Sequence, residues 1–285
     1  MKKIISVLLV AVMVVSAMCV LASCGGEKVE YVPVKLTNEQ YAYGVSKNDA
    51  ELLATVNKVL TDIKANGTLE AIVEKYFSYD EANFKKYPAG VEDSSKKQLV
   101  VATNTPFSPF EFAVYNEGTK YFCGIDMEIA ALIAEEMGAE LVIKDQAFDT
   151  LLTAVETGKA DIVMAGLTVS EEREEQVTFS QTYYEASQVI IVKAGDETFK
   201  DCTTAAQVEE ILKGMDKNTV IGYQNGTTGG LYVEGDADWG FEGFNVTAKG
   251  YDSAVTATQA LVNGQIDFVV VDEGPAKIIV DQMNS

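Results

Sequence analysis

Two charged residues of this chain could bind opposite charges. Arg173 lies in the run SEEREE, and its planar guanidinium group matches the two oxygens of a carboxylate. Asp272 directly follows the apolar run FVVV, and a carboxylate at the carboxyl end of a buried parallel strand faces the usual ligand crevice. Both residues also fit ordinary roles, because Arg173 could be a solvated helix residue among its neighbouring glutamates and Asp272 could cap a helix.

The segment NGTTGG, residues 225–230, is a further candidate for anion binding. A loop that enters a helix at Thr227 and Thr228 presents free backbone amides to a negative charge. The segment lacks the lysine of a P-loop, which argues against a nucleotide, and an ordinary glycine turn fits it equally well.

The composition narrows the class of protein. A chain of 285 residues with 47% hydrophobic and 23% charged residues can fold around a sizeable core. Its formal charge of -21 argues against a nucleic-acid partner, which needs clustered lysine and arginine. The chain has no histidine, which removes His-activated nucleophiles and His-ligated metals, and we expect neither a metal nor a cofactor.

The first 23 residues resemble a bacterial lipoprotein signal peptide. Lys2 and Lys3 precede an uncharged run, and small residues then precede Cys24. In such signals the cysteine is acylated, so we expect a lipid anchor at Cys24; a plain signal peptide or a short membrane-spanning helix is the alternative. Cys123 and Cys202 show no metal-motif spacing, and the spacing leaves their pairing open.

Apolar strand-like runs alternate with helix-like runs along most of the chain. This alternation predicts an α/β protein with mostly parallel sheets covered by helices. Residues 79–97 combine mixed charges with Pro88, Gly90 and a serine pair, which is typical of a linker. The expected strands are 31–34, 40–45, 99–102, 141–143, 161–164, 188–192, 220–222, 244–248 and 268–271, and the expected helices are 51–63, 68–76, 127–137, 148–157, 205–212, 253–262 and 275–280.

Several segments resemble polar amino-acid-binding proteins of ABC importers, the bacterial extracellular solute-binding proteins of family 3. Three of them, QLVVATNTPFSPFEF, GIDMEIAALIAEEMG and GKADIVMAGLTVSEEREEQ, resemble the first half of that family. IGYQNGTTGGLYV and QIDFVVVDEGPAKIIV resemble its second lobe, whereas its closing segment, LTNEQYAYGV…IKANGTLEAIVEKYF, stands near the front of this chain. The resemblance implies a two-lobed type 2 periplasmic-binding-protein fold that is circularly permuted. A fragment of a tandem-repeat gene, with a segment exchanged between molecules, is the alternative.

This order of segments implies a set of domain boundaries. It also implies a monomer, and a dimer that exchanges a segment between its two chains is the alternative. The expected parts are a signal peptide at 1–23, a tether at 24–30, the last strand of lobe 2 with a hinge crossing at 31–45, the C-terminal helices of lobe 1 at 46–78, a linker at 79–97, lobe 1 with a hinge at 98–188, and lobe 2 at 189–285.

The resemblance also implies a set of ligand contacts. Arg173, Thr168 and Thr228 would hold the α-carboxylate of an amino acid, and Asp272 with the Gly166 carbonyl would hold its α-ammonium group. The ligand side chain would lie among Asn104, Phe107, Phe148, Ala165 and Gln224. Relatives that prefer cationic amino acids tend to carry an acid at the place of Asn104, so the neutral residue favours a polar ligand such as glutamine.

The implied function is that of an extracytoplasmic, membrane-anchored component of an ABC importer, without catalytic activity. It would capture a free amino acid by closure of its lobes and deliver it to a membrane permease. A ligand-presenting sensory module for a membrane receptor is one alternative. The other is an enzyme similar to cyclohexadienyl dehydratase, which would need a general acid such as Glu111 or Glu273.

Overall fold

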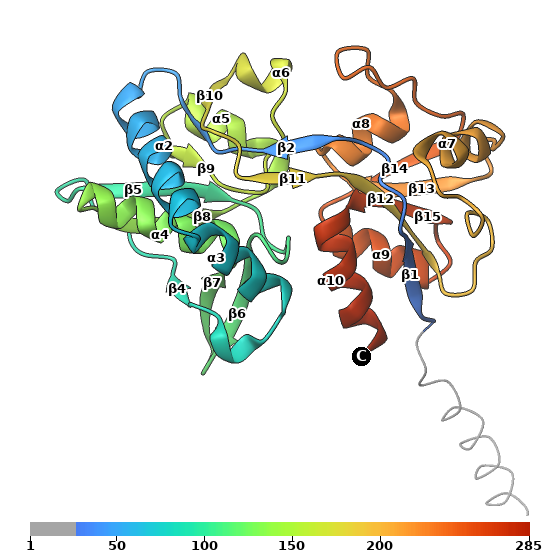
Figure 1. Ribbon diagram of the computed structural model, residues 1–285, viewed down its shortest axis with the longest axis horizontal. Coiled ribbons are helices and arrows are strands. Elements are labelled where there is room, and N and C mark those ends of the chain that lie inside the picture. The colour runs from blue at the N-terminus through green and yellow to red at the C-terminus, as the bar shows by residue number, and fades with distance from the viewer. Residues whose placement is uncertain (1–26) are drawn as a thin grey trace, which may run out of the picture.

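The computed structural model describes residues 27–285, so the expected signal peptide and Cys24 lie outside the described residues. The chain forms two lobes, each built on a five-stranded sheet with helices packed on its faces (Figure 1). Within residues 27–285, no helix has the length and apolar character needed to cross a membrane. The expected α/β fold with two lobes is confirmed.

Lobe 1 contains a mixed sheet. Its strand β5 pairs in parallel with β8 and with β9, as the strand–helix alternation predicts. Strand β3 pairs antiparallel with β9 and with β10, which the alternation does not predict. In sheet order the strands are β10 (Val177–Phe179), β3 (Gly44–Ser46), β9 (Ile162–Val163), β5 (Gln98–Thr103) and β8 (Glu140–Asp145).

Helices of lobe 1 form where apolar residues recur at helical spacing. The Asp49 side chain accepts a hydrogen bond from the Leu52 amide at 2.8 Å, so α2 begins where the sequence predicts. Asn66 ends this helix, and α3 begins directly after Gly67. The helices are α2 (Ala50–Ala65), α3 (Thr68–Phe77), α4 (Ile125–Met137), α5 (Leu151–Glu156) and α6 (Glu171–Glu174), with short 3-10 turns η1 (Glu81–Asn83) and η2 (Phe148–Thr150).

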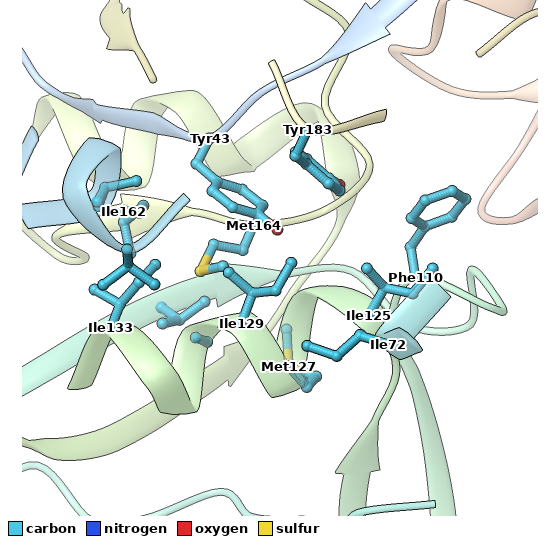
Figure 2. Packing of buried hydrophobic residues seen from close by; sticks show 14 of the residues in the cluster. Tyr43, Ile72, Phe110, Ile125, Met127, Ile129, Ile133, Ile162, Met164 and Tyr183 are labelled. Atoms are coloured by element: carbon cyan, nitrogen blue, oxygen red, sulfur yellow. The ribbon is translucent and has the colours of Figure 1, made fainter. Parts of the chain in front are cut away.

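The core of lobe 1 lies around α4. Ile125, Ile129 and Ile133 follow one face of this helix and are fully buried (Figure 2). They pack in one cluster with Tyr43 and Met164, which come from segments far away in the sequence. This packing fixes the segment that follows β9, which carries several of the expected site residues.

Lobe 2 repeats the mixed arrangement. Strand β13 pairs in parallel with β14 and β15, whereas β12 is antiparallel to β15 and to β1. The helices are α7 (Ala205–Lys213), α8 (Thr228–Glu234), α9 (Ala254–Val262) and α10 (Glu273–Asn284). In sheet order the strands are β1 (Val29–Val32), β12 (Gln188–Lys193), β15 (Phe268–Asp272), β13 (Val220–Gln224) and β14 (Thr247–Tyr251).

Two short strands cross between the lobes. Strands β2 (Glu39–Tyr41) and β11 (Tyr184–Ala186) pair antiparallel and run side by side from one lobe to the other (Figure 1). From β1 in lobe 2 the chain therefore crosses to lobe 1 through β2, and it returns through β11 to β12.

The two ends of the described chain lie side by side in lobe 2. The Val29 amide donates to Asn284 Oδ1 at 3.1 Å, and Asn284 Nδ2 donates to the Val29 carbonyl at 2.8 Å. Figure 1 shows α10 running beside β1, so the C-terminus lies next to the start of the first strand.

Several elements differ from the sequence-based expectation. The expected strand 40–45 is divided between β2 and β3, because the chain leaves the hinge pair and joins the sheet of lobe 1 there. The expected strand 244–248 begins later, since the Phe244 ring packs at 5.3 Å from the Tyr232 ring instead of joining the sheet. The expected linker 79–97 is partly ordered, because β4 (Tyr87–Pro88) pairs with β7.

A hairpin that the sequence reading missed completes lobe 1. Strands β6 (Phe112–Asn116) and β7 (Thr119–Cys123) are joined by Glu117 and Gly118, both with positive φ, as in a tight hairpin turn. Cys123 is buried and Cys202 half-buried, and both are free thiols.

Candidate ligand-binding site

A small cavity of about 10 Å³ lies between the lobes, and residues of both lobes line it. Nearly all expected ligand contacts are found there, although they come from distant parts of the sequence. From lobe 1 the lining residues are Phe107, Phe148, Gly166, Thr168 and Arg173, and from lobe 2 they are Gln224, Thr227, Thr228 and Asp272.

Two members of the expected set lie outside this lining, and one lining residue is additional. Asn104 is not a lining residue itself but contacts one, because its Oδ1 accepts a hydrogen bond from Gln224 Nε2 at 2.7 Å. Ala165 is buried next to Gly166 and is not among the lining residues. Thr227 lines the cavity at the entrance to α8, where the sequence predicts free amides.

Arg173 is buried in α6, with only 6% of its surface exposed, so it is not a solvated helix residue. Its guanidinium group donates to the Thr168 carbonyl at 2.7 Å and to the Gly226 carbonyl of lobe 2 at 3.1 Å. Among residues 27–285, no carboxylate forms an ion pair with it. Burial lowers the pKa of Arg173, and the nearby Glu39 carboxylate opposes that shift.

The Arg173 guanidinium group lies over two aromatic rings. Phe148 of lobe 1 lies 5.6 Å from the guanidinium carbon, and Trp239 of lobe 2 lies 5.5 Å from it. These rings remove water from the cation without neutralising it, which leaves a desolvated donor group facing the cavity.

Asp272 ends the buried strand β15 and occupies the N-cap position of α10, but its side chain makes no capping hydrogen bond. Instead it accepts a hydrogen bond from the Tyr41 hydroxyl group at 2.5 Å. Burial, followed by the charge of Glu39, raises the pKa of Asp272 to about 7. The carboxylate therefore gains stability when a cation approaches it.

Glu39 is a buried carboxylate that the sequence reading missed. It lies on the hinge strand β2, where it accepts hydrogen bonds from Thr168 Oγ1 at 2.8 Å and from Gln188 Nε2 at 3.0 Å. A hydroxyl group has one proton to donate, so the Thr168 hydroxyl is engaged within the protein. The sequence gives no local signal for this role, because the short run EQY has no distinctive pattern.

Gly166 has a conformation and a position that require glycine. Its φ is +52°, and a Cβ atom there would lie 2.6 Å from the Phe107 ring. Its amide donates to Asp126 Oδ2 at 2.9 Å. Asp126 therefore supports the cavity wall from inside α4, whose N-cap position is held by Gly124.

The two candidate acids for an enzymatic reaction are not among the residues that line the cavity. Glu111 is fully buried, and burial raises its pKa well above the ordinary range. Glu273 is ion-paired with Lys35 and Lys277. Of the described residues that line the cavity, Asp272 alone carries a carboxyl group.

Several proteins of known identity are similar to part of this chain in sequence. The arginine-binding extracellular protein ArtP of Bacillus subtilis (strain 168) is 37% identical over 139 residues, which cover 46% of this chain and 53% of that protein. The ABC transporter arginine-binding protein 1 of Escherichia coli (strain K12) is 31% identical over 180 residues, which cover 63% of this chain and 65% of that protein. The chain thus spans about half to two thirds of the length of these relatives.

A solved structure of an ancestral arginine-binding protein bound to glutamine is also similar. It matches with a TM-score of 0.54 and 35% identity, over 66% of this chain and 74% of that one. The family model of bacterial extracellular solute-binding proteins, family 3, matches residues 5–79 and 99–232. Together with the two-lobed fold and the cavity between the lobes, this match shows that the chain belongs to the bacterial extracellular solute-binding proteins of family 3.

Proposed function

We propose that the protein is the extracytoplasmic substrate-binding component of an ABC importer and that it holds one free amino acid between its lobes. One observation carries this proposal: within residues 27–285, Arg173 is buried without a carboxylate partner, and it shares a cavity with the buried Asp272 of the other lobe. A zwitterion supplies the missing carboxylate to one residue and an ammonium group to the other. The amides at Thr227 and Thr228 would add donors to the carboxylate, and the Gly166 carbonyl an acceptor for the ammonium group.

The ligand side chain favoured by the cavity is polar and uncharged, and glutamine is the first candidate. Phe107 and Phe148 supply apolar surface and Gln224 supplies an amide, which Asn104 holds from outside the lining. Gln224 Oε1 is buried and has no hydrogen-bond partner within residues 27–285, so it suits a ligand N–H donor. The ancestral relative with bound glutamine is consistent with such a ligand.

Capture would proceed by closure of the two lobes about the hinge strands β2 and β11. The contacts of Gln224 with Asn104 and of Gly226 with Arg173 join the lobes, and the ligand would add its own contacts to both sides. A ligand that makes more contacts in the closed state shifts the equilibrium towards it. A micromolar affinity corresponds to about 8 kcal/mol, which a few charge-assisted hydrogen bonds and aromatic contacts can supply.

The order of the segments supports a circular permutation. The hydrogen bonds between Val29 and Asn284 bring the described ends together, as expected if an ancestral chain ran continuously from lobe 2 into β1. Residues 79–97 would then join the older termini within lobe 1. A lipid anchor at Cys24 would hold lobe 2 within about 25 Å of the membrane, since an extended chain spans about 3.5 Å per residue.

A binding role is better supported than a catalytic one. Neither Glu111 nor Glu273 reaches the cavity lining, so the site offers no placed general acid apart from Asp272 among its described lining residues.

Isothermal titration calorimetry tests the proposal directly. The mature chain with Cys24→Ser, which avoids acylation, is titrated with each of the twenty amino acids. We expect saturable binding of one polar amino acid at a 1:1 ratio, with glutamine first. If none of the twenty binds, the proposed function is wrong.

A further inference from the structure

The segment between α8 and β14 forms a compact loop, residues 235–243, which we call the Trp239 loop. Asp236 and Phe241 exchange backbone hydrogen bonds of 2.9 and 2.8 Å, which close the loop. The Asp236 side chain also accepts from the amides of Asp238 at 3.0 Å and Trp239 at 3.1 Å. These bonds hold Trp239 at the tip of a defined turn.

The base of the loop is closely packed. Gly235 and Gly243 both have positive φ, and a Cβ atom on Gly235 would lie 2.9 Å from the Glu242 carbonyl oxygen. The Phe241 ring stacks on the Trp239 indole at 6.1 Å and also meets the Tyr232 ring of α8 at 5.4 Å. The loop is therefore anchored to lobe 2 and moves with it.

Trp239 belongs to lobe 2, but its indole contacts Arg173 of lobe 1. The guanidinium group of Arg173 lies over this indole as well as over the Phe148 ring, and together with Thr168 and Glu39 the indole lines the groove next to the ligand cavity. The indole N–H is buried and has no partner within residues 27–285. When the lobes separate, this ring has to leave Arg173, while Phe148 stays with lobe 1.

We propose that Trp239 is a positioning residue of the ligand site, which covers Arg173 from lobe 2 when the lobes close. The covered guanidinium group lies over one ring from each lobe and Arg173 is only 6% exposed, so the rings and the two carbonyls that it donates to fix its position at the cavity. The strength of the carboxylate contact is thereby tied to closure, because only the closed arrangement supplies the second ring. This inference rests on the proposed amino-acid binding.

The chain contains a single tryptophan, so its fluorescence reports on this contact alone. Acrylamide quenching of the wild-type protein is measured with and without the amino acid that binds in calorimetry. We expect the ligand to reduce quenching, because closure places the indole against Arg173.

Two variants test the role in affinity. Trp239→Leu removes the aromatic face, and we expect an affinity roughly five- to twentyfold lower, the size of effect that a partly desolvated cation–π contact gives. Trp239→Phe keeps a ring and should retain most of the affinity. Thermal melting without ligand checks that both variants fold. If Trp239→Leu does not fold, the quenching measurement on the wild-type protein tests the inference by itself.

The outcomes separate this inference from the proposed function. Amino-acid binding without any change in quenching, or with wild-type affinity in a folded Trp239→Leu variant, overturns the inference and leaves the function standing. If no amino acid binds the wild-type protein, both are overturned. Reduced quenching, together with a loss in Trp239→Leu that Trp239→Phe restores, supports the inference.

Discussion

The hydroxyl group of Tyr41 donates a hydrogen bond to the Asp272 carboxylate at 2.5 Å. Tyr41 lies on the hinge strand β2, and Asp272 lies at the end of the central strand of lobe 2. Burial raises the pKa of Tyr41 well above its ordinary range, so the phenol stays protonated and remains a donor. The segment that would bend during closure thus contacts the proposed ammonium-binding residue directly.

Replacing Tyr41 by phenylalanine should weaken amino-acid binding. The hydrogen bond favours the ionised form of Asp272, so its loss makes that carboxylate harder to ionise. We expect an affinity about tenfold lower at neutral pH, in the range of a hydrogen bond to a charged group. Calorimetry measures the change, and thermal melting checks the fold. Unchanged affinity at neutral pH would show that Tyr41 does not support this residue.

Amino-acid affinity should rise with pH up to about neutrality. Without ligand, burial and the charge of Glu39 raise the pKa of Asp272 to about 7, so below that pH the group is mostly protonated. A bound ammonium group favours the carboxylate, so binding releases a proton and affinity falls by up to about tenfold per pH unit below the pKa. Calorimetry from pH 5 to 8, in buffers with different ionisation heats, counts the released proton. A flat profile in the wild type would refute this account, and Asp272→Asn should remove the dependence.

Asn104→Asp should shift the ligand preference towards lysine or arginine. The aspartate can still accept the hydrogen bond from Gln224 Nε2, so the contact between the lobes survives the change. It also places a negative charge at the end of the cavity that now holds amides. Thermal-shift measurements with twenty amino acids compare the variant with Asn104→Ser, which adds no charge. An unaltered ligand profile in Asn104→Asp would mean that this end of the cavity does not hold the ligand side chain.

A variant in which the segments are put back into the order of the family should fold, and should bind the amino acid, like the natural chain. The reordered protein runs from residue 79 to 285 and continues with residues 27–78, so that the segment with β4 and the buried Phe84 is kept. Because Val29 and Asn284 already share two hydrogen bonds, this connection needs little rearrangement. We expect a similar melting temperature and affinity, and a monomer by light scattering for both chains. A dimeric natural chain together with an unfolded reordered one would favour exchange of the front segment between molecules.

Local patterns predicted the long elements well. Helix α2 begins after Asp49 and ends at Asn66, because capping and periodicity are both local properties of the sequence. The hairpin of β6 and β7 was missed, since its pairing depends on the register between two strands. Strands β3 and β12 were predicted, but their antiparallel pairing was not, because each follows a crossing between the lobes.

The site was predicted by resemblance more than by pattern. The run SEEREE suggests a solvated arginine, and only the packing of Phe148 and Trp239 from distant segments buries Arg173. Glu39 was missed for the same reason, since its partners Thr168 and Gln188 are far away in the sequence. Burial by distant segments has no local sequence signal, so the structure was needed to find it.

The central claim is that Arg173 and Asp272 bind the two ends of one zwitterion, and calorimetry with charge-matched variants tests it most directly. Arg173→Lys keeps the charge and loses the planar fork, while Asp272→Asn keeps the shape and loses the charge. We predict that each variant folds and loses about a hundredfold or more in amino-acid affinity, since each removes a buried charge-assisted contact. Wild-type affinity in either folded variant would contradict the account.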